Sequence, residues 1–358
     1  MTDRAKNIVW KLAKAAVGLA VFAWVVYKGR VSFGRISDAD PWLIAGGFAA
    51  LLLVPIAGWL RWWSVVRAQG IPLSLYGAFR LQMIGVIFNA FLLGSIGGDA
   101  MKAYYLASGP GSDKKAASIM SIGLDRMYGV VALFLLIGSQ IPFAWAILTA
   151  KREIAVFVGI AAGIYVFALV AAAILMIPRL RARRRLRFEI WMAGTGWRAK
   201  VARVIDPADE AIQEVRRRPL MSLYCTAISL VAHLATVAAF FLFGRALGTA
   251  SVPFSNYIVL APLALAATGL PLLPLGGLGV GEWVASVVFG VAAEVGKWFG
   301  GTVLFLWRIG LLVPGPLGVL YFVMHRKELA PSAGATEKES GEPSPPSAGP
   351  ASGGGRAE

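Results

Sequence analysis

Five charged residues lie within segments that are otherwise apolar: Asp99, Asp125, Arg126, Glu282 and Arg308. A charge at membrane depth costs about 2.5–3.5 kcal/mol on insertion scales, so such residues usually face a partner or a cavity. An arginine guanidinium keeps its charge and can bind a phosphate through two parallel hydrogen bonds. A carboxylate beside a substrate path can gate that path or carry a coupling proton. Together these residue types indicate a site for an anionic headgroup.

Each of these residues also has a structural interpretation, which the sequence leaves open. Asp99 and Glu282 both follow a glycine-rich stretch, where a first-turn acid would complement exposed amides and the helix dipole. Arg126 and Arg308 could instead form internal ion pairs with acids, or extend to the membrane interface. Asn89 could contact a substrate or satisfy backbone groups that are freed nearby.

Two apolar segments, at about 78–107 and 255–293, are interrupted by glycines directly before one of these acids. The glycines concerned are Gly97, Gly98, Gly276, Gly277 and Gly279. Glycine runs and prolines interrupt a helix, and the freed backbone groups must then be satisfied inside the protein or by trapped water. Amides that begin a new half-helix are suited to phosphate, although small residues also permit close helix packing. We predict two re-entrant or broken helical hairpins that meet within the bilayer.

The remainder of the chain has the pattern of a membrane protein. Of its 358 residues, 58% are hydrophobic, whereas soluble domains have about 45–50%. Apolar runs of about 20 residues, long enough to cross a hydrocarbon core, recur along the chain. We predict spans at about 8–27, 42–66, 117–138, 153–177, 220–247 and 300–324. The expected fold is an all-α polytopic membrane protein with about six transmembrane helices plus the two hairpins. Residues 1–329 form one membrane domain, and 330–358 are expected to be a disordered tail.

Basic residues determine the expected orientation. A loop at about 179–219 is rich in arginine, and such loops stay on the cytoplasmic side. Counting spans outward from it places both termini in the cytoplasm, with the protein in a bacterial inner membrane. The two hairpins then open to opposite sides, as in inverted-repeat transporters. Because their sequence similarity is weak, an inverted repeat and two unrelated breaks both remain open.

Several function classes are not expected. The net charge of +16 is accounted for by membrane topology, and no base-reading module is present, so we predict no nucleic-acid binding. The single cysteine excludes an intrachain disulfide, and the two histidines are too few and too far apart for a metal site. There is no nucleotide-binding P-loop and no zinc-protease motif, so we expect no cofactor.

Other polar side chains in the spans have simple interpretations. His233 lies on an apolar helix and is expected to be packed or hydrogen-bonded rather than to relay protons. Trp59, Trp62 and Trp63, which flank Arg61, are interpreted as anchors at the membrane interface.

Several of these motifs, in this order, resemble those of the lysylphosphatidylglycerol synthase transmembrane-region family, and the resemblance covers about residues 8–325. The residues that carry it are Gly85, Phe88, Asn89, Gly94, Ser95, Gly97, Gly98, Asp99 and Lys102, then Asp125, Arg126 and Gly129, then Pro274, Gly276, Gly277, Gly279 and Glu282. Leu93 stands where proline is usual, and Lys102 where arginine is usual. The second difference replaces a guanidinium fork with a point charge.

In two-domain members, the region that this chain resembles is credited with flipping aminoacylated phosphatidylglycerol, which a separate cytosolic domain makes. Related stand-alone members are tied to varied lipid roles, including polyprenyl-linked sugars and hopanoids. No synthase domain occurs in these 358 residues, so the resemblance implies flippase-like activity without synthase activity.

Three functional hypotheses follow. The first is a translocase for an anionic or phosphate-bearing lipid, such as a phosphatidylglycerol derivative or a polyprenyl-phosphate-linked lipid. The second is a membrane-embedded lipid transferase, for which a donor-binding motif is missing. The third is an accessory subunit that holds a separate lipid-modifying enzyme through the basic loop, although that loop more simply binds the anionic inner leaflet. The expected partners in the first hypothesis are membrane lipids with a phosphate-bearing headgroup.

Overall fold

The computed structural model describes residues 16–17, 19–91, 96–108, 115–149, 159, 163, 217–249, 251–268 and 277–325. Several predicted features therefore lie outside the described residues. They are most of the span at 153–177, nearly all of the basic loop at about 179–219, the tail at 330–358, the start of the first span and Gly276.

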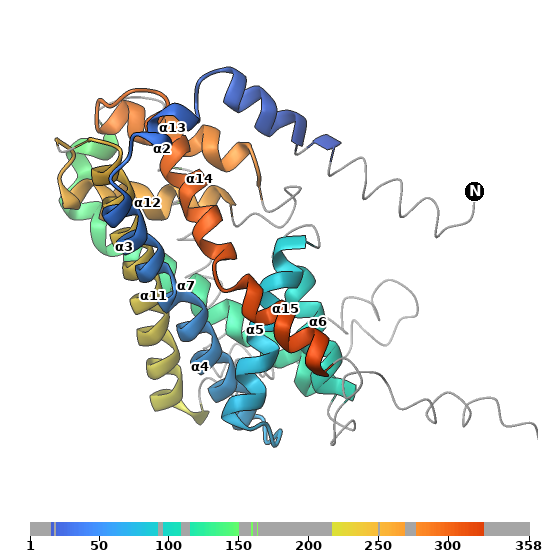
Figure 1. Cartoon of the computed structure of the whole chain (residues 1–358). Helices are drawn as coiled ribbons and strands as arrows, with labels where there is room; N and C mark the ends of the chain where they lie inside the picture. Colours follow the sequence, from blue (N-terminus) through green and yellow to red (C-terminus); the bar gives the residue numbers. More distant parts are fainter. Residues whose placement is uncertain are drawn as a thin grey trace, which may run out of the picture.

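The described chain is helical throughout its regular structure, as predicted. The helices are α2 (Phe33–Ser37), α3 (Pro41–Leu51), α4 (Leu53–Ala68), α5 (Leu75–Phe91), α6 (Ile96–Ser108), α7 (Lys115–Thr149), α11 (Pro219–Ala246), α12 (Phe254–Thr268), α13 (Val280–Ala292), α14 (Phe299–Leu312) and α15 (Gly315–His325). Figure 1 shows α3, α4, α7 and α11 side by side as a bundle, with α14 and α15 crossing in front.

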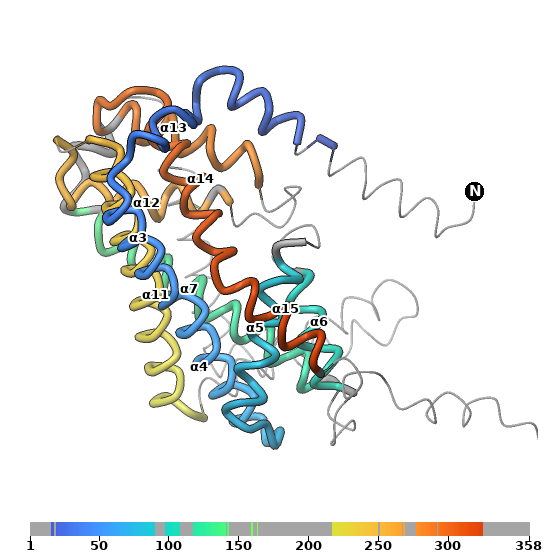
Figure 2. Tube along the Cα trace, viewed as in Figure 1, coloured from blue at the N-terminus to red at the C-terminus, as the bar shows by residue number. Residues whose placement is uncertain are grey.

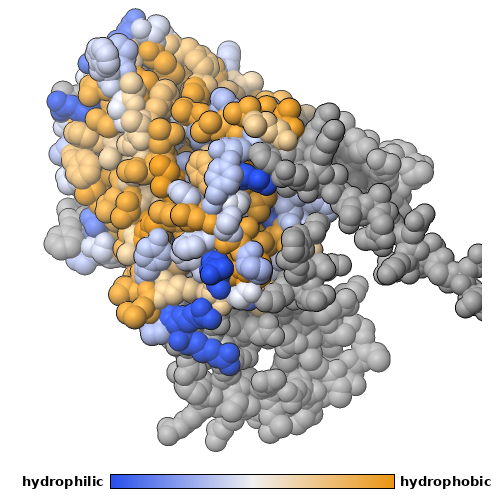
Figure 3. All heavy atoms as spheres, turned by 60° about the horizontal axis from the view of Figure 1, so that its bottom comes forward, coloured by the Kyte–Doolittle hydropathy of each residue, from blue (hydrophilic) through white to orange (hydrophobic). Residues whose placement is uncertain are grey.

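Four predicted spans are confirmed among the described residues. Apolar helical segments long enough to cross a membrane run over Pro41–Ala68, Ala117–Gln140, Pro219–Ala246 and Phe299–Met324. The first combines α3 with α4 and the last combines α14 with most of α15. Many exposed side chains on these spans are large and hydrophobic, and hydrophobic atoms cover much of the face shown in Figure 3, as a lipid-facing surface requires. The described part of the first predicted span is helical over residues 19–27.

Local sequence explains where the spans begin. The Asp40 side chain accepts hydrogen bonds from the amides of Trp42 and Leu43, and Pro41 occupies the first turn of α3. Pro219 opens α11 in the same way. Proline is tolerated there because the first amides of a helix have no partner within it.

The two predicted hairpins are the helix pairs α5–α6 and α12–α13. The arms after the breaks, α6 and α13, each have 13 residues. At 1.5 Å per residue such a helix is about 20 Å long, too short to cross a hydrocarbon core of about 30 Å. Re-entrant arms of this length are what the sequence predicts.

The hairpins lie at opposite ends of the bundle, α5–α6 in the lower part of Figures 1 and 2 and α12–α13 in the upper part. Phe79 of α5 packs its ring on Trp59 in the second half of the Pro41–Ala68 span, with centroids 5.0 Å apart. Tyr257 of α12 instead lies against Gly244, near the end of α11. That end is next to the start of α3, because the Asp40 amide donates to the Ala246 carbonyl at 3.1 Å.

An aromatic core positions the second hairpin. Tyr257 of α12, Phe289 of α13 and Phe299 of α14 are fully buried and make edge-to-face or tilted ring contacts with one another. Phe240 and Phe243 of α11 complete this core. Aromatic pairs of this kind are favourable beyond the area that they bury, so the hairpin is held firmly against the spans.

Candidate functional site

Asp99 lies in the first turn of α6 and is paired with two cations. Arg126 Nε of α7 donates to Asp99 Oδ2 at 2.6 Å, and Lys102 Nζ lies 3.2 Å from Oδ1. Lys102 is buried, and its Nζ also donates to Gln82 Oε1 at 3.3 Å and lies 4.9 Å from the centre of the Trp62 ring. Helix α6 thus places both an acidic side chain, Asp99, and a basic side chain, Lys102, inside the bundle.

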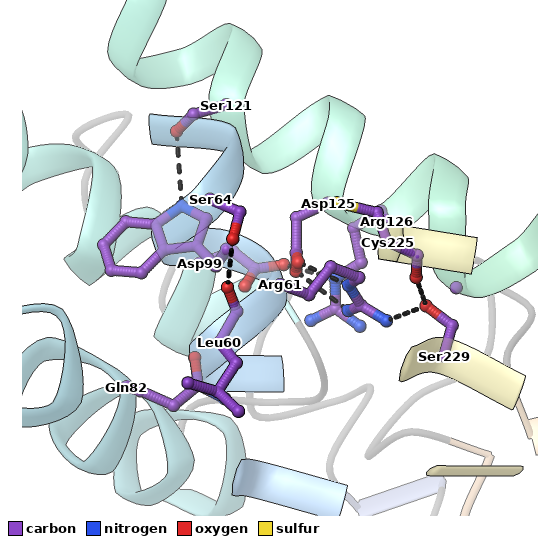
Figure 4. Close-up of polar contacts among 12 residues, drawn as sticks. Leu60, Arg61, Ser64, Gln82, Asp99, Ser121, Asp125, Arg126, Cys225 and Ser229 are labelled. Atoms are coloured by element: carbon purple, nitrogen blue, oxygen red, sulfur yellow. Dashed lines mark hydrogen bonds and ion pairs between the residues drawn. The ribbon is translucent and has the colours of Figure 1, made fainter. Parts of the chain in front are cut away.

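Asp125, the neighbour of Arg126 on α7, is held by Arg61 of α4. Arg61 Nε and Nη2 donate to the two carboxylate oxygens at 2.6 and 3.1 Å. Its Nη1 donates to Ser229 Oγ of α11 at 2.8 Å. Figure 4 shows these side chains gathered where α4, α7 and α11 come together, with Asp99 and Arg126 beside them.

Arg61, Asp99, Lys102, Asp125 and Arg126 form one electrostatic unit, called here the α6 cluster. Lys102 and Arg126, as well as Arg61, interact electrostatically with the Asp125 carboxylate. Asp99 likewise interacts electrostatically with the Arg61 guanidinium. Three cations face two carboxylates, so the five side chains together carry a net charge of +1 when both acids are ionised. An excess of positive charge inside a low-dielectric bundle attracts an anion.

Glu282 is the centre of a second unit, the α13 cluster, which consists of Glu282, Arg308, Gly277 and Gly279. The Glu282 side chain is fully buried in the first turn of α13. Its Oε2 accepts from the Gly279 amide at 2.7 Å, and its Oε1 accepts from Arg308 Nε of α14. Arg308 Nη2 donates to the Gly277 carbonyl at 3.0 Å. Both glycines have positive φ, of 70° and 83°, which other residues adopt at a cost.

The two clusters repeat the same arrangement. In each, an acid in the first turn of a 13-residue helix after a glycine break pairs with the Nε of an arginine in the next span. The acid and the arginine are 27 residues apart in the first case and 26 in the second. Because the hairpins also lie at opposite ends of the bundle, the structure favours an inverted repeat over two unrelated breaks.

The clusters do not form one joint site, which differs from the expectation that the breaks meet. Gly310, two residues beyond Arg308, packs against Phe48 and Leu51 of α3. Arg61 of the α6 cluster is ten residues beyond Leu51 on the same span. At 1.5 Å per residue, the two charged units lie at levels about 15 Å apart. Short re-entrant arms from opposite ends produce this separation.

The glycines near the first break serve close packing. A methyl group on Gly98 would collide with the Gly85 carbonyl of α5, so only glycine allows this approach of the two arms. The Gly98 amide donates to Asn89 Oδ1 at 2.8 Å, so Asn89 satisfies a backbone group at the start of α6. Gly97 precedes it in the same turn.

The second break is packed in a comparable way. A side chain on Gly279 would meet the backbone of Val21 and Phe22, so the first predicted span lies directly against this turn. Gly276 lies outside the described residues. For Arg126 and Arg308 the structure shows the internal ion pair, and for Glu282 it shows the helix-capping contact as well.

Arg61, Lys102 and Ser229 were not among the residues predicted for the site. The three tryptophans that flank Arg61 in the sequence favour a position at the membrane interface. Trp62, however, is fully buried, and its Nε1 donates to Ser121 Oγ at 3.2 Å, so it is not an interfacial anchor. The available signal was an arginine inside an otherwise apolar span, which usually has a buried partner.

His233 agrees with its simpler interpretation. Its Nε2 lies 3.0 Å from the Gly129 carbonyl oxygen, which links α11 to α7 one turn beyond Ser229. The hydrogen bond makes it a connection between spans.

Comparison with known proteins extends these observations. Searches of curated proteins and of solved structures return no match. The profile of the family described as lysylphosphatidylglycerol synthase TM region matches residues 11–318, a stretch that includes every residue of both clusters. With its apolar spans and two charged hairpins, the chain is a multi-pass membrane protein that belongs to the lysylphosphatidylglycerol synthase TM region family.

Proposed function

We propose that this protein is a translocase for phosphate-bearing or anionic membrane lipids. The observation that carries the proposal is a pair of contacts between a buried carboxylate and an arginine, Asp99–Arg126 and Glu282–Arg308, each at the start of a re-entrant arm. Charged groups within apolar spans are costly, and they are commonly found along substrate pathways. Membership of this family supports a role in lipid chemistry.

The two levels of charge suit the movement of a headgroup across the bilayer. A lipid that crosses must keep its phosphate among polar groups while its tails stay in hydrocarbon. Two charged units about 15 Å apart along one span divide a core of about 30 Å into shorter steps. At the α6 cluster the guanidinium of Arg126 can exchange its carboxylate for a phosphate, because both anions accept paired hydrogen bonds.

The proposal assigns the carboxylates a holding role. In the absence of lipid, Asp99 and Glu282 neutralise the arginines and keep their guanidinium groups oriented. A phosphate that arrives competes with Asp99 for Arg126, so this contact opens and closes as the headgroup passes. We further propose an inner-membrane location with both termini in the cytoplasm, supported by the basic residues at 179–219. No catalytic step is assigned to the chain.

A reconstituted flip assay tests this function. The full chain is placed in phosphatidylcholine vesicles that contain fluorescent phosphatidylglycerol, and lipid reaching the inner leaflet is measured by its protection from a quencher. Parallel vesicles contain fluorescent polyprenyl phosphate. The parent protein should accelerate flipping of at least one probe over protein-free vesicles, and Asp99→Asn, Arg126→Ala and Glu282→Gln should each slow it by about tenfold, the effect of losing about 1.4 kcal/mol.

The matched control is Arg245→Ala. Arg245 is an exposed arginine at the end of α11 that stacks on Phe241 and belongs to neither cluster. This variant should flip lipid like the parent. Equal rates with and without protein, or parental rates in all three site variants, would rule out the proposed function.

A further inference from the structure

Arg126 differs from Arg308 in its surroundings. Its side chain is 48% exposed, against 18% for Arg308. It lies on a stripe of α7 that faces outward, since Ile119 is 66% exposed, Val130 is 49% exposed and Gly123 is exposed between them. Residues at spacings of three or four share one face of a helix. A charged guanidinium is therefore presented on the outer, largely apolar face of a candidate membrane span.

The carboxylate partners of the two arginines also differ. Asp99 pairs with Lys102 as well as with Arg126, so it stays neutralised when Arg126 turns to another anion. Among the residues that the structure describes, Arg308 is the one cation paired with the fully buried Glu282. Releasing Arg308 would leave a charge buried without compensation, which is strongly unfavourable.

The net charges of the two clusters also distinguish them as sites for an anion. The five side chains of the α6 cluster sum to +1, whereas Glu282 and Arg308 sum to zero. A phosphodiester carries one negative charge, while a phosphomonoester carries about −1.5 to −2 near pH 7. A single phosphodiester would bring the α6 cluster to neutrality.

From these differences we infer that the two clusters have different roles within the proposed function. The α6 cluster is a lateral binding site for one phosphodiester headgroup of a membrane lipid, reached from the bilayer along the outward face of α7, with Arg126 as the residue that binds the phosphate. The α13 cluster is a closed latch that holds its hairpin. Lys102 neutralises Asp99 while Arg126 is engaged with lipid, and Arg61 keeps Asp125 from competing for Arg126.

The inference is tested by binding, separately from flipping. Short-chain dioctanoyl phosphatidylglycerol is titrated calorimetrically into the full chain in a neutral detergent, and dioctanoyl phosphatidic acid and inorganic phosphate are titrated in parallel. Phosphatidylglycerol should bind more tightly than phosphatidic acid, and inorganic phosphate should not compete at similar concentrations. Arg126→Ala should weaken phosphatidylglycerol binding by about tenfold or more, as expected for one charge-assisted contact.

Asp99→Asn should not weaken phosphatidylglycerol binding as Arg126→Ala does. It removes the carboxylate that competes with phosphate and raises the cluster charge to +2, so phosphatidylglycerol should bind at least as tightly as to the parent. If Asp99 has only a structural role, Asp99→Asn should instead weaken phosphatidylglycerol binding, as Arg126→Ala does.

Gly123→Trp tests the lateral route. A Cβ atom built at Gly123 meets nothing within 4 Å and the position is exposed, so we expect an indole there to extend over the surface one turn from Arg126. It should weaken lipid binding by about tenfold while leaving the melting temperature unchanged. Gly34→Trp is the matched control, because Gly34 of α2 is equally open and lies outside both clusters.

The outcomes separate the two proposals. If lipid binds with this pattern but no variant or parent flips it, the site stands and the translocase function is wrong. If the parent flips lipid while Arg126→Ala and Gly123→Trp bind phosphatidylglycerol like the parent, the lateral site is overturned. Competition by inorganic phosphate at equal affinity would likewise overturn the assignment to a lipid headgroup.

Discussion

Arg61 holds both oxygens of Asp125 and, through its third nitrogen, the hydroxyl of Ser229. One side chain thereby connects α4, α7 and α11, three of the four described spans. The contact is buried, where a two-point guanidinium–carboxylate pair fixes geometry as well as charge. In the proposed function it is the rigid base beside which Arg126 exchanges Asp99 for a phosphate.

Removing Arg61 should be among the most damaging changes to stability. Arg61→Ala leaves Asp125 buried without its main cation, which costs about 3–5 kcal/mol in comparable pairs. The double variant Arg61→Met, Asp125→Leu removes both charges and should recover most of this loss. Thermal unfolding of the purified protein in detergent measures both. A double variant as unstable as Arg61→Ala would mean that the hydrogen bonds, and not the stranded charge, carry the effect.

The two hairpin arginines should differ in their contribution to stability. Arg308→Ala leaves the buried Glu282 carboxylate without its cation, whereas after Arg126→Ala the Asp99 carboxylate is still paired with Lys102. The first should therefore lower the melting temperature clearly more than the second. Glu282→Gln combined with Arg308→Met should restore part of the loss, because glutamine can still accept from the Gly279 amide. Equal losses for Arg126→Ala and Arg308→Ala would contradict the different roles given to the two clusters.

Gly98 and Gly123 allow a matched test of close packing. Gly98→Ala drives a methyl group into the Gly85 carbonyl and should separate α5 from α6, with a loss of about 1–3 kcal/mol typical of overpacking. Gly123→Ala meets open space within the same kind of helix and should be neutral or stabilising by about 0.5–1 kcal/mol. Unfolding midpoints compare the two directly, and similar values would show that the close approach of α5 and α6 is relaxed in solution.

Tyr257 offers a test of the aromatic core. Its ring is fully buried, but its hydroxyl has no hydrogen-bond partner among the residues that the structure describes. A buried polar group without a partner is costly, so Tyr257→Phe should be neutral or stabilising. Tyr257→Ala should cost about 3–5 kcal/mol, because it opens a cavity among Phe289, Phe299 and Phe241. A marked loss on Tyr257→Phe would show that the hydroxyl is bonded after all.

The sequence by itself determined the membrane fold, four spans that the structure describes, and the position of both hairpins. Each of these follows from local properties: long apolar runs must cross the bilayer, and glycine runs must interrupt a helix. It also identified Asp99, Asp125, Arg126, Glu282 and Arg308 as unusual, because the cost of a charge in an apolar segment depends on its surroundings along the chain.

Only the tertiary structure decided which charges are partners. Asp125 is next to Arg126 in sequence yet pairs with Arg61, which is 64 residues away, while Arg126 turns to Asp99. Adjacent residues of a helix point about 100° apart, so their partners are chosen by whichever helices pack on each face. The sequence predicted that the hairpins open to opposite sides, but the level that each short arm reaches was decided by packing, so two clusters form where the breaks were expected to meet.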